Sequence, residues 1–136
     1  MMRSSTSIDV QYRDFRFALT FIDLCERSNA AQIAIEIEAD FSGQQLRYQS
    51  NNSWFEYSAL DSFASSLRED GPAILVDQSE YPILEIARIE TIDWLSLHPR
   101  AERESSKASQ LRFVVQLPAG FSNKLWQAFD DFPKWW

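Results

Sequence analysis

The chain has 136 residues, a net charge of −7, 14% aromatic residues and three glycines. This length fits a single domain, residues 1–136, with a hydrophobic core of its own, and the low glycine content excludes a fibrous or low-complexity class. One cysteine excludes an internal disulfide, and no apolar stretch approaches the roughly 18 residues that a membrane span needs, so we expect no membrane partner.

Most of the negative charge lies in the middle of the chain. Residues 29–98 carry twelve acidic and three basic side chains. Such a segment repels phosphate backbones, so we expect no binding of nucleic acid. It would attract a basic protein and speed the encounter with it. The alternative interpretation is that this charge serves solubility alone.

The first part of the chain has the pattern of strands. Residues 1–8 carry no apolar run and are expected to form a loose N-terminal lead-in. Residues 15–24 alternate apolar and polar side chains, which is typical of a half-buried strand. Residues 31–41 alternate more cleanly, with one apolar face. The opposite face carries the acidic side chains Glu36, Glu38 and Asp40.

Turn signals follow this second strand. Ser42 and Gly43 predict a tight turn into a third strand at 45–49. Residues 50–53, Ser-Asn-Asn-Ser, predict another turn, because asparagine tolerates left-handed backbone. Residues 54–57 are then either a fourth strand or the third strand resumed after a bulge.

The pattern then changes to the period of a helix. In residues 58–70 the apolar positions recur at i, i+3, i+4 and i+7. Ser58 with Asp61 three residues later is a signature of a helix start. Gly71 and Pro72 end the helix.

The next segments again predict strands. Residues 73–77 form a short apolar run, and residues 83–92 are rich in isoleucine, which favours strand. A bulge near 87–88 would reconcile the imperfect alternation, with a short helix as the alternative. Residues 99–109 have no apolar face and are expected to form an exposed loop. Residues 111–117 alternate as a strand.

A second helix is predicted near the end of the chain. Ser122 is a candidate cap, and Phe121 before it could pack on Trp126 as a hydrophobic staple. The helix should end near 131–132, because Pro133 disfavours helix at the residue before it.

Together these patterns predict an α+β fold. We expect a single curved antiparallel sheet of about six or seven strands with two helices against its apolar face, in the order ββββ-α-βββ-α. Short connections between neighbouring strands favour antiparallel hairpins.

The sequence offers no catalytic motif and no cofactor motif. Cys25 and His98 are far apart, and Cys25 closes an apolar strand, where a cysteine is usually buried and inert. The acidic strand face could offer oxygens to a hard cation, but every second residue of a half-exposed strand is polar anyway. Arg16 or Arg47 on neighbouring strands could pair with those carboxylates instead. We therefore expect no metal and no cofactor, and we favour a protein without enzymatic activity over a small enzyme.

The chain ends with aromatic residues. Trp135 and Trp136 lie beyond Pro133, so they cannot extend the apolar stripe of the preceding helix. One interpretation is that at least one tryptophan folds back as a lid over the domain. The other is that both, flanked by Asp130 and Asp131, anchor a partner or a second copy.

The pattern W-x-E-Y-S-x-L-x-x-F-x-x-x-L over residues 54–67, followed by a hairpin, the strand L-R-F-V-V-Q-L and an aromatic helix, resembles small uncharacterised bacterial α+β proteins, some of them immunity-like. The resemblance implies a cytoplasmic binding protein that neutralises a basic toxin or nuclease. Two alternatives are a small ligand-binding protein or enzyme with an aromatic-lined pocket, and a self-associating structural module. The candidate partner-binding residues are Glu36, Glu38, Asp40, Asp130, Asp131, Trp135 and Trp136.

Overall fold

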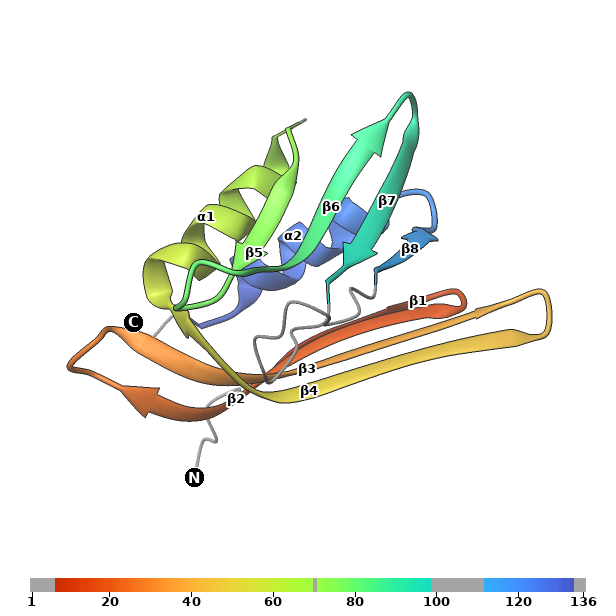
Figure 1. Ribbon diagram of the computed structural model, residues 1–136. Helices are drawn as coiled ribbons and strands as arrows, with labels where there is room; N and C mark the ends of the chain where they lie inside the picture. Colours follow the sequence, from red (N-terminus) through yellow and green to blue (C-terminus); the bar gives the residue numbers. More distant parts are fainter. Residues whose placement is uncertain (1–6, 70, 99–111, 134–136) are drawn as a thin grey trace, which may run out of the picture.

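The computed structural model describes residues 7–69, 71–98 and 112–133, and Figure 1 shows how their helices and strands are arranged. In chain order the elements are β1 (Ser7–Tyr12), β2 (Phe15–Cys25), β3 (Ala30–Phe41), β4 (Gln44–Glu56), α1 (Tyr57–Arg68), β5 (Ala73–Val76), β6 (Pro82–Ile89), β7 (Ile92–Leu97), β8 (Phe113–Gln116) and α2 (Phe121–Asp131). The predicted α+β class, with two helices among the described residues, is confirmed.

The described strands form two antiparallel sheets of four strands each. Strands β1–β4 make sheet A and strands β5–β8 make sheet B, each in chain order. The predicted single sheet of six or seven strands is therefore wrong. Helix α1 follows β4 and carries the chain away from sheet A, so that β5 starts a new sheet in contact with the helix. Alternation identifies strands, but it does not show where hydrogen bonding between them is interrupted.

A tight hairpin turn joins β3 to β4. Both of its central residues have positive φ, 52° at Ser42 and 74° at Gly43. Positive φ at both positions is the geometry of hairpin turns whose twist matches that of the strands. The turn predicted from the Ser-Gly pair is confirmed.

Strand β4 continues through the predicted turn at 50–53. It runs without interruption from Gln44 to Glu56, and its register with β3 shifts between Ile33 and Ile35. The Asn-rich stretch is therefore a bulge within one long strand, which confirms the second of the two predicted alternatives.

Strand β1 was missed by the sequence analysis. Ser7 and Ile8, which fall within the predicted lead-in, pair with Thr20 and Leu19 of β2. Its six residues alternate polar and apolar side chains, which is a strand signal that the prediction of a lead-in overlooked. Residues 1–6 of the lead-in lie outside the described residues.

The predicted strand over 83–92 is confirmed as far as Ile89, but the residues after it turn into a second strand of a hairpin. Strand β6 ends at Ile89, and β7 begins at Ile92, which pairs directly with it. Glu90 makes the turn with a φ of 60°. Glutamate is not a typical turn residue, which explains why neither this turn nor β7 was predicted.

Both helices occupy the predicted segments, but they begin differently. Ser58 and Ser122 lie inside the first turn of their helices rather than at the cap. The N-cap residues are Glu56 and Gly120, and neither makes a side-chain cap hydrogen bond. The predicted serine caps are therefore wrong, whereas the predicted end of α2 near Asp131 is confirmed.

The inner faces of both sheets and the apolar sides of both helices share one cluster of buried residues. The helices lie over sheet A, and sheet B packs beside them (Figure 1). Phe121 is the first residue of α2 and packs on Phe15 of β2, so the predicted staple, which needs Phe121 outside the helix, is wrong. Aromatic pairs join α2 to β2 and to α1: Phe15–Phe121, Phe21–Phe132 and Phe63–Phe129, with ring centroids 4.8, 5.3 and 5.8 Å apart.

Candidate functional site

The outer face of sheet A carries the acidic strand residues that the sequence singled out. Successive side chains of a strand point to opposite faces, so the isoleucines of β3 face the core while its acidic side chains face outward. Strand register places Arg16 of β2 and Arg47 of β4 on either side of Glu38. We call this surface the charged face; it comprises Asp9, Arg16, Glu36, Glu38, Asp40, Arg47 and Gln49.

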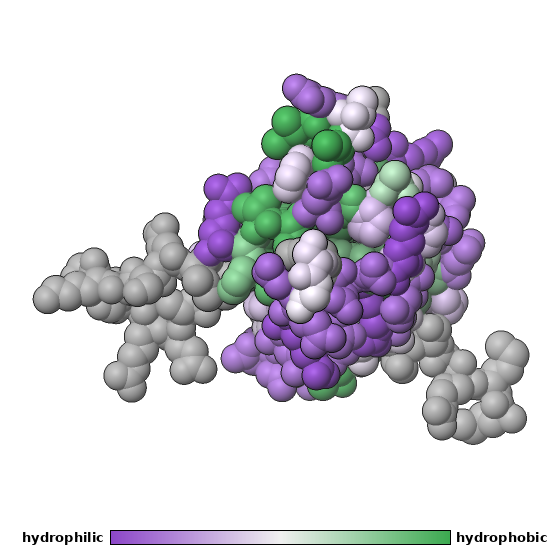
Figure 2. Space-filling model, turned by 90° about the vertical axis from the view of Figure 1, so that its right-hand side faces the viewer, coloured by the Kyte–Doolittle hydropathy of each residue, from purple (hydrophilic) through white to green (hydrophobic). Residues whose placement is uncertain are grey.

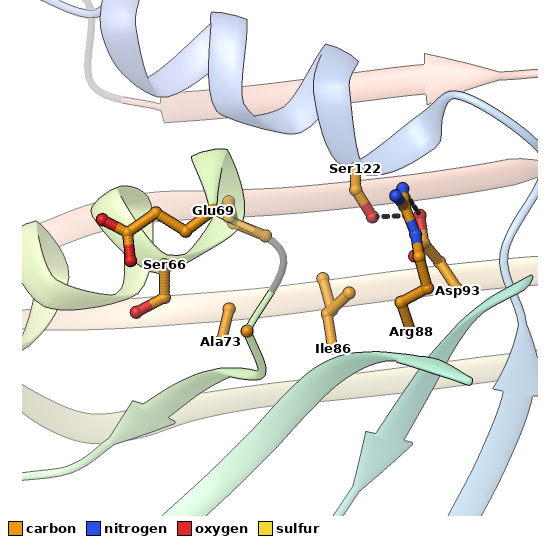
Figure 3. A pocket seen from close by; sticks show the side chains of 9 residues that line it. Ser66, Glu69, Ala73, Ile86, Arg88, Asp93 and Ser122 are labelled. Atoms are coloured by element: carbon orange, nitrogen blue, oxygen red, sulfur yellow. Dashed lines mark hydrogen bonds and ion pairs between the residues drawn. The ribbon is translucent and has the colours of Figure 1, made fainter. Parts of the chain in front are cut away.

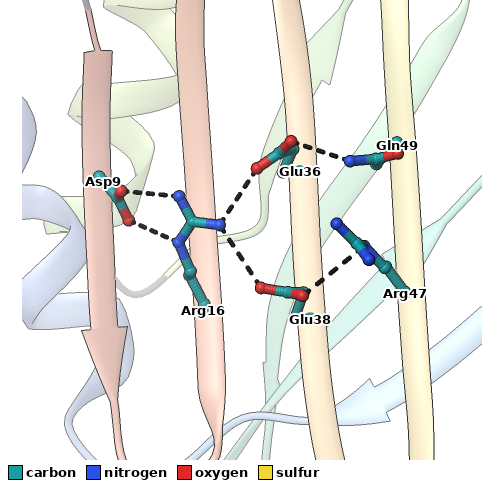
Figure 4. Close-up of polar contacts among 6 residues, drawn as sticks. All are labelled: Asp9, Arg16, Glu36, Glu38, Arg47 and Gln49. Carbon is teal, nitrogen blue, oxygen red and sulfur yellow. Dashed lines mark hydrogen bonds and ion pairs between the residues drawn. The ribbon is translucent and has the colours of Figure 1, made fainter.

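Arg16 contacts three carboxylates on the charged face (Figure 4). Its Nε and Nη2 atoms donate to the two oxygens of Asp9 at 3.1 and 2.8 Å. Its Nη1 atom donates to Glu36 at 3.1 Å and to Glu38 at 3.4 Å. The pKa of the Arg16 guanidinium is raised well above its usual value, chiefly by the hydrogen bond to Asp9. Arg16 therefore stays charged throughout the physiological pH range.

Two side chains of β4 extend this network. Arg47 Nε lies 3.6 Å from Glu38 Oε1, and Gln49 Nε2 donates to Glu36 Oε1 at 2.9 Å. The predicted pairing of Arg16 or Arg47 with the acidic strand face is thereby confirmed. No group of three or more His, Cys, Asp or Glu side chains that could hold a metal ion occurs among the described residues.

The remaining candidate residues lie in different places. Asp40 is exposed near the end of β3, on the charged face. Asp130 and Asp131 are exposed at the end of α2. Because α2 packs on the inner side of sheet A, the sheet separates these two aspartates from the charged face. Trp135 and Trp136, like the predicted loop at 99–109, lie outside the described residues.

A second polar cluster, which the sequence analysis missed, joins sheet B to α2 (Figure 3). Arg88 Nε donates to Asp93 Oδ1 at 2.9 Å, and Ser122 Oγ donates to Asp93 Oδ2 at 2.8 Å. The Asp93 side chain is only 10% exposed, while that of Arg88 is 49% exposed. No spacing in the sequence connects β7 to the start of α2, so this contact carried no signal.

The cavity beside this cluster is small. Its volume is about 30 Å³, whereas sites for small molecules typically measure about 300–1,000 Å³. None of its described lining residues is aromatic. The cluster therefore links β7 to α2 through hydrogen bonds. The cavity beside it has room for roughly one or two water molecules.

Cys25 differs from the sequence-based expectation. It is partly exposed at the end of β2, where a buried cysteine was predicted. The pKa of its thiol is lowered, chiefly by a hydrogen bond from the Ser28 side chain. His98 follows β7, and its backbone N–H donates to the Ile83 carbonyl at 2.8 Å. Cys25 thus belongs to sheet A, and His98 lies beside sheet B.

Comparison of the chain with protein-family models, with curated proteins and with solved structures found no match. No helix within the described residues is both long enough and apolar enough to cross a membrane.

Proposed function

We propose that this chain is a non-enzymatic protein-binding domain that binds a basic partner protein through the charged face. The observation that carries the proposal is the contact of Arg16 with Asp9, Glu36 and Glu38, at 2.8, 3.1 and 3.4 Å. Three carboxylates from β1 and β3, the two strands that flank β2, already surround the guanidinium group of Arg16. Arginine and lysine side chains of a partner would be bound by the same charge-assisted hydrogen bonds.

The charged face has capacity for further basic groups. It carries four carboxylates against two guanidinium groups. The side chains of Asp9, Glu36 and Glu38 remain 44, 36 and 43% exposed. An ionised carboxylate can accept about four hydrogen bonds, and the internal network uses only part of that capacity. Donors from a partner can therefore be added without breaking the network.

The overall charge favours the same kind of partner. A chain with a net charge of −7 attracts a basic protein over distances of about 8–10 Å at physiological salt. The resemblance to immunity-like bacterial proteins suggests a basic toxin or nuclease as that partner. On this proposal the chain acts in the bacterial cytoplasm and neutralises its partner by covering a basic surface.

Two matched double variants test the proposal. Asp40→Lys with Gln45→Lys changes the charge at one end of the charged face, where residues 40 and 45 pair with each other, and leaves the Arg16 contacts in place. Gln127→Lys with Asp130→Lys makes the same change on the exposed side of α2. The two variants have equal net charge, so any difference in binding depends on position.

The immobilised chain is incubated with extract of the native host at low salt, and the retained proteins are identified. We expect a basic protein whose binding is weakened at least about tenfold by the first variant and unchanged by the second. The bound protein should be released as the salt concentration rises. Equal binding by the first variant and the unaltered chain, or indifference to salt, contradicts the proposal. Loss in the second variant alone would instead locate the partner at Asp130 and Asp131.

A further inference from the structure

The outer face of sheet B carries several exposed apolar side chains, whereas sheet A carries the charged face and has its exposed apolar residues, Ile22 and Leu24, near the end of β2. Figure 2 shows apolar side chains gathered over the upper part of the molecule, where sheet B lies, and polar ones below. Three of the apolar residues, Ile74, Ile89 and Val114, are 41, 61 and 49% exposed. We call this surface the apolar face; it comprises Ile74, Ala87, Ile89, Ile92, Trp94 and Val114.

Strand pairing makes most of the apolar face continuous. Across β6 and β7, Ala87 pairs with Trp94 and Ile89 pairs with Ile92. Val114 of β8 lies diagonally beside Trp94. Gln116, which pairs directly with Trp94, is an exposed polar residue beside these apolar ones. Large exposed apolar patches commonly mark interaction surfaces.

The apolar face carries one acidic and one basic group on opposite sides of β7. Glu85 of β6 lies in one row with Ser96 of β7 and Val114 of β8. Arg112, two residues before Val114, donates through Nη2 to Ser96 Oγ at 3.5 Å. These two charges cancel, so the face is neutral in a chain whose net charge is −7.

We propose that the apolar face binds the same face of a second copy of this chain, around a two-fold axis parallel to β7. This rotation lays β7 over β7 of the partner subunit and β6 over β8 of the partner subunit. Trp94 then packs on Trp94 of the partner subunit, and Glu85 comes within reach of Arg112 of the partner subunit. Each contact occurs twice, as in any isologous interface, and the sheets stack about 10 Å apart.

The distribution of charge favours a second copy over other partners. Two copies of this acidic chain repel each other through most of their surfaces. The apolar face has no net charge to oppose their approach, and its acidic and basic groups are placed so that a two-fold rotation pairs them. A basic partner would gain no net electrostatic attraction from this face, because its acidic and basic groups, Glu85 and Arg112, balance each other.

The proposed interface is small. The face spans four strands, of which β5 and β8 each have four residues. Interfaces at the low end of the size range form weak or transient complexes, so we expect half-dissociation at about 10–100 µM. The dimer would therefore form where the chain is abundant.

Exchanging the charges of Glu85 and Arg112 tests whether the apolar face forms the dimer and whether the two-fold axis is parallel to β7. Sedimentation velocity is measured for the unaltered chain, Glu85→Arg, Arg112→Glu and the double variant. The protein concentration covers about 5–500 µM, which brackets the dissociation constant expected for a small interface. Each single variant places like charges opposite each other and should weaken the dimer at least about tenfold. The double variant restores opposite charges and should return the dissociation constant to within about threefold of the original.

Two controls separate binding from folding. Asp40→Arg makes the same charge change as Glu85→Arg, but on the charged face, and should leave the dimer unchanged. Val114→Thr keeps the side-chain size at an exposed strand position and should weaken the dimer while circular dichroism stays the same. A monomer at every concentration overturns the proposal. A dimer that the single variants do not weaken, or that the double variant fails to restore, overturns it as well.

Discussion

Sheets A and B have the same number of strands and the same antiparallel order, yet their outer faces differ in chemistry. Sheet A exposes a network of carboxylates and guanidinium groups, and sheet B exposes isoleucine, valine and tryptophan side chains. In β3 the isoleucines all share one face, so alternation alone tells which face is buried. In β6 both faces carry isoleucine or leucine, so only the packing against the helices decides. The alternation of apolar and polar residues therefore predicts which face is buried in sheet A but not in sheet B.

The largest predicted effect tests whether the two sheets depend on the same core. Phe121 is fully buried and contacts Phe15 of β2. Phe121→Ala should lower the free energy of unfolding by about 3–5 kcal/mol, because it removes a buried aromatic ring and leaves a cavity. Hydrogen exchange should become faster by the same factor in β3 and in β6. Loss of protection in sheet A alone would mean that the sheets are separate folding units.

A smaller loss of stability is expected when the hydrogen bonds between sheet B and α2 are removed. Asp93→Ala removes the acceptor for Arg88 and Ser122 (Figure 3). We expect a loss of about 1–3 kcal/mol in the free energy of unfolding, because the buried Ser122 hydroxyl and the half-exposed Arg88 both lose a charged partner. Ser122→Ala should lose less, about 1 kcal/mol. Urea unfolding measures both values, and a larger loss for the serine variant would contradict the central role of Asp93.

The smallest effect should come from the charged face, because its ion pairs are exposed to water. Arg16→Met should lower the free energy of unfolding by about 1 kcal/mol at low salt, since three carboxylates lose their shared partner. The difference should shrink as salt screens their repulsion. Arg47→Met is the matched control, because Arg47 is 67% exposed and makes a single contact at 3.6 Å. An effect of Arg47→Met equal to that of Arg16→Met would contradict this ranking.

The same contrast explains how far the sequence could predict the structure. The positions of the helices followed from the 3.6-residue period of their apolar residues. The pairing of Arg16 and Arg47 with the acidic strand face was predictable, because hairpins bring side chains of the same parity together on neighbouring strands. These features depend on patterns that are local in the sequence.

The features that the sequence did not predict depend on long-range geometry. The β6–β7 turn relies on Glu90 in a left-handed conformation, which glutamate does not signal. The bond between Asp93 and Ser122 joins elements that no spacing rule connects. The division into two sheets, and with it the apolar face, follows from how α1 and α2 pack between the strands. Periodicity carries no information on that packing.

The contact between Phe15 and Phe121 also has a consequence for protein synthesis. On the ribosome, sheet A emerges complete while the helix that covers the inner surface of β2 is still untranslated. Contacts between distant parts of a chain form slowly, because a long loop must close before they are gained. The nascent chain therefore exposes a row of phenylalanines and isoleucines until α2 has been translated. Chaperones that bind aromatic segments should associate with it during this interval, and faster translation of the segment from β5 to α2 should shorten the interval.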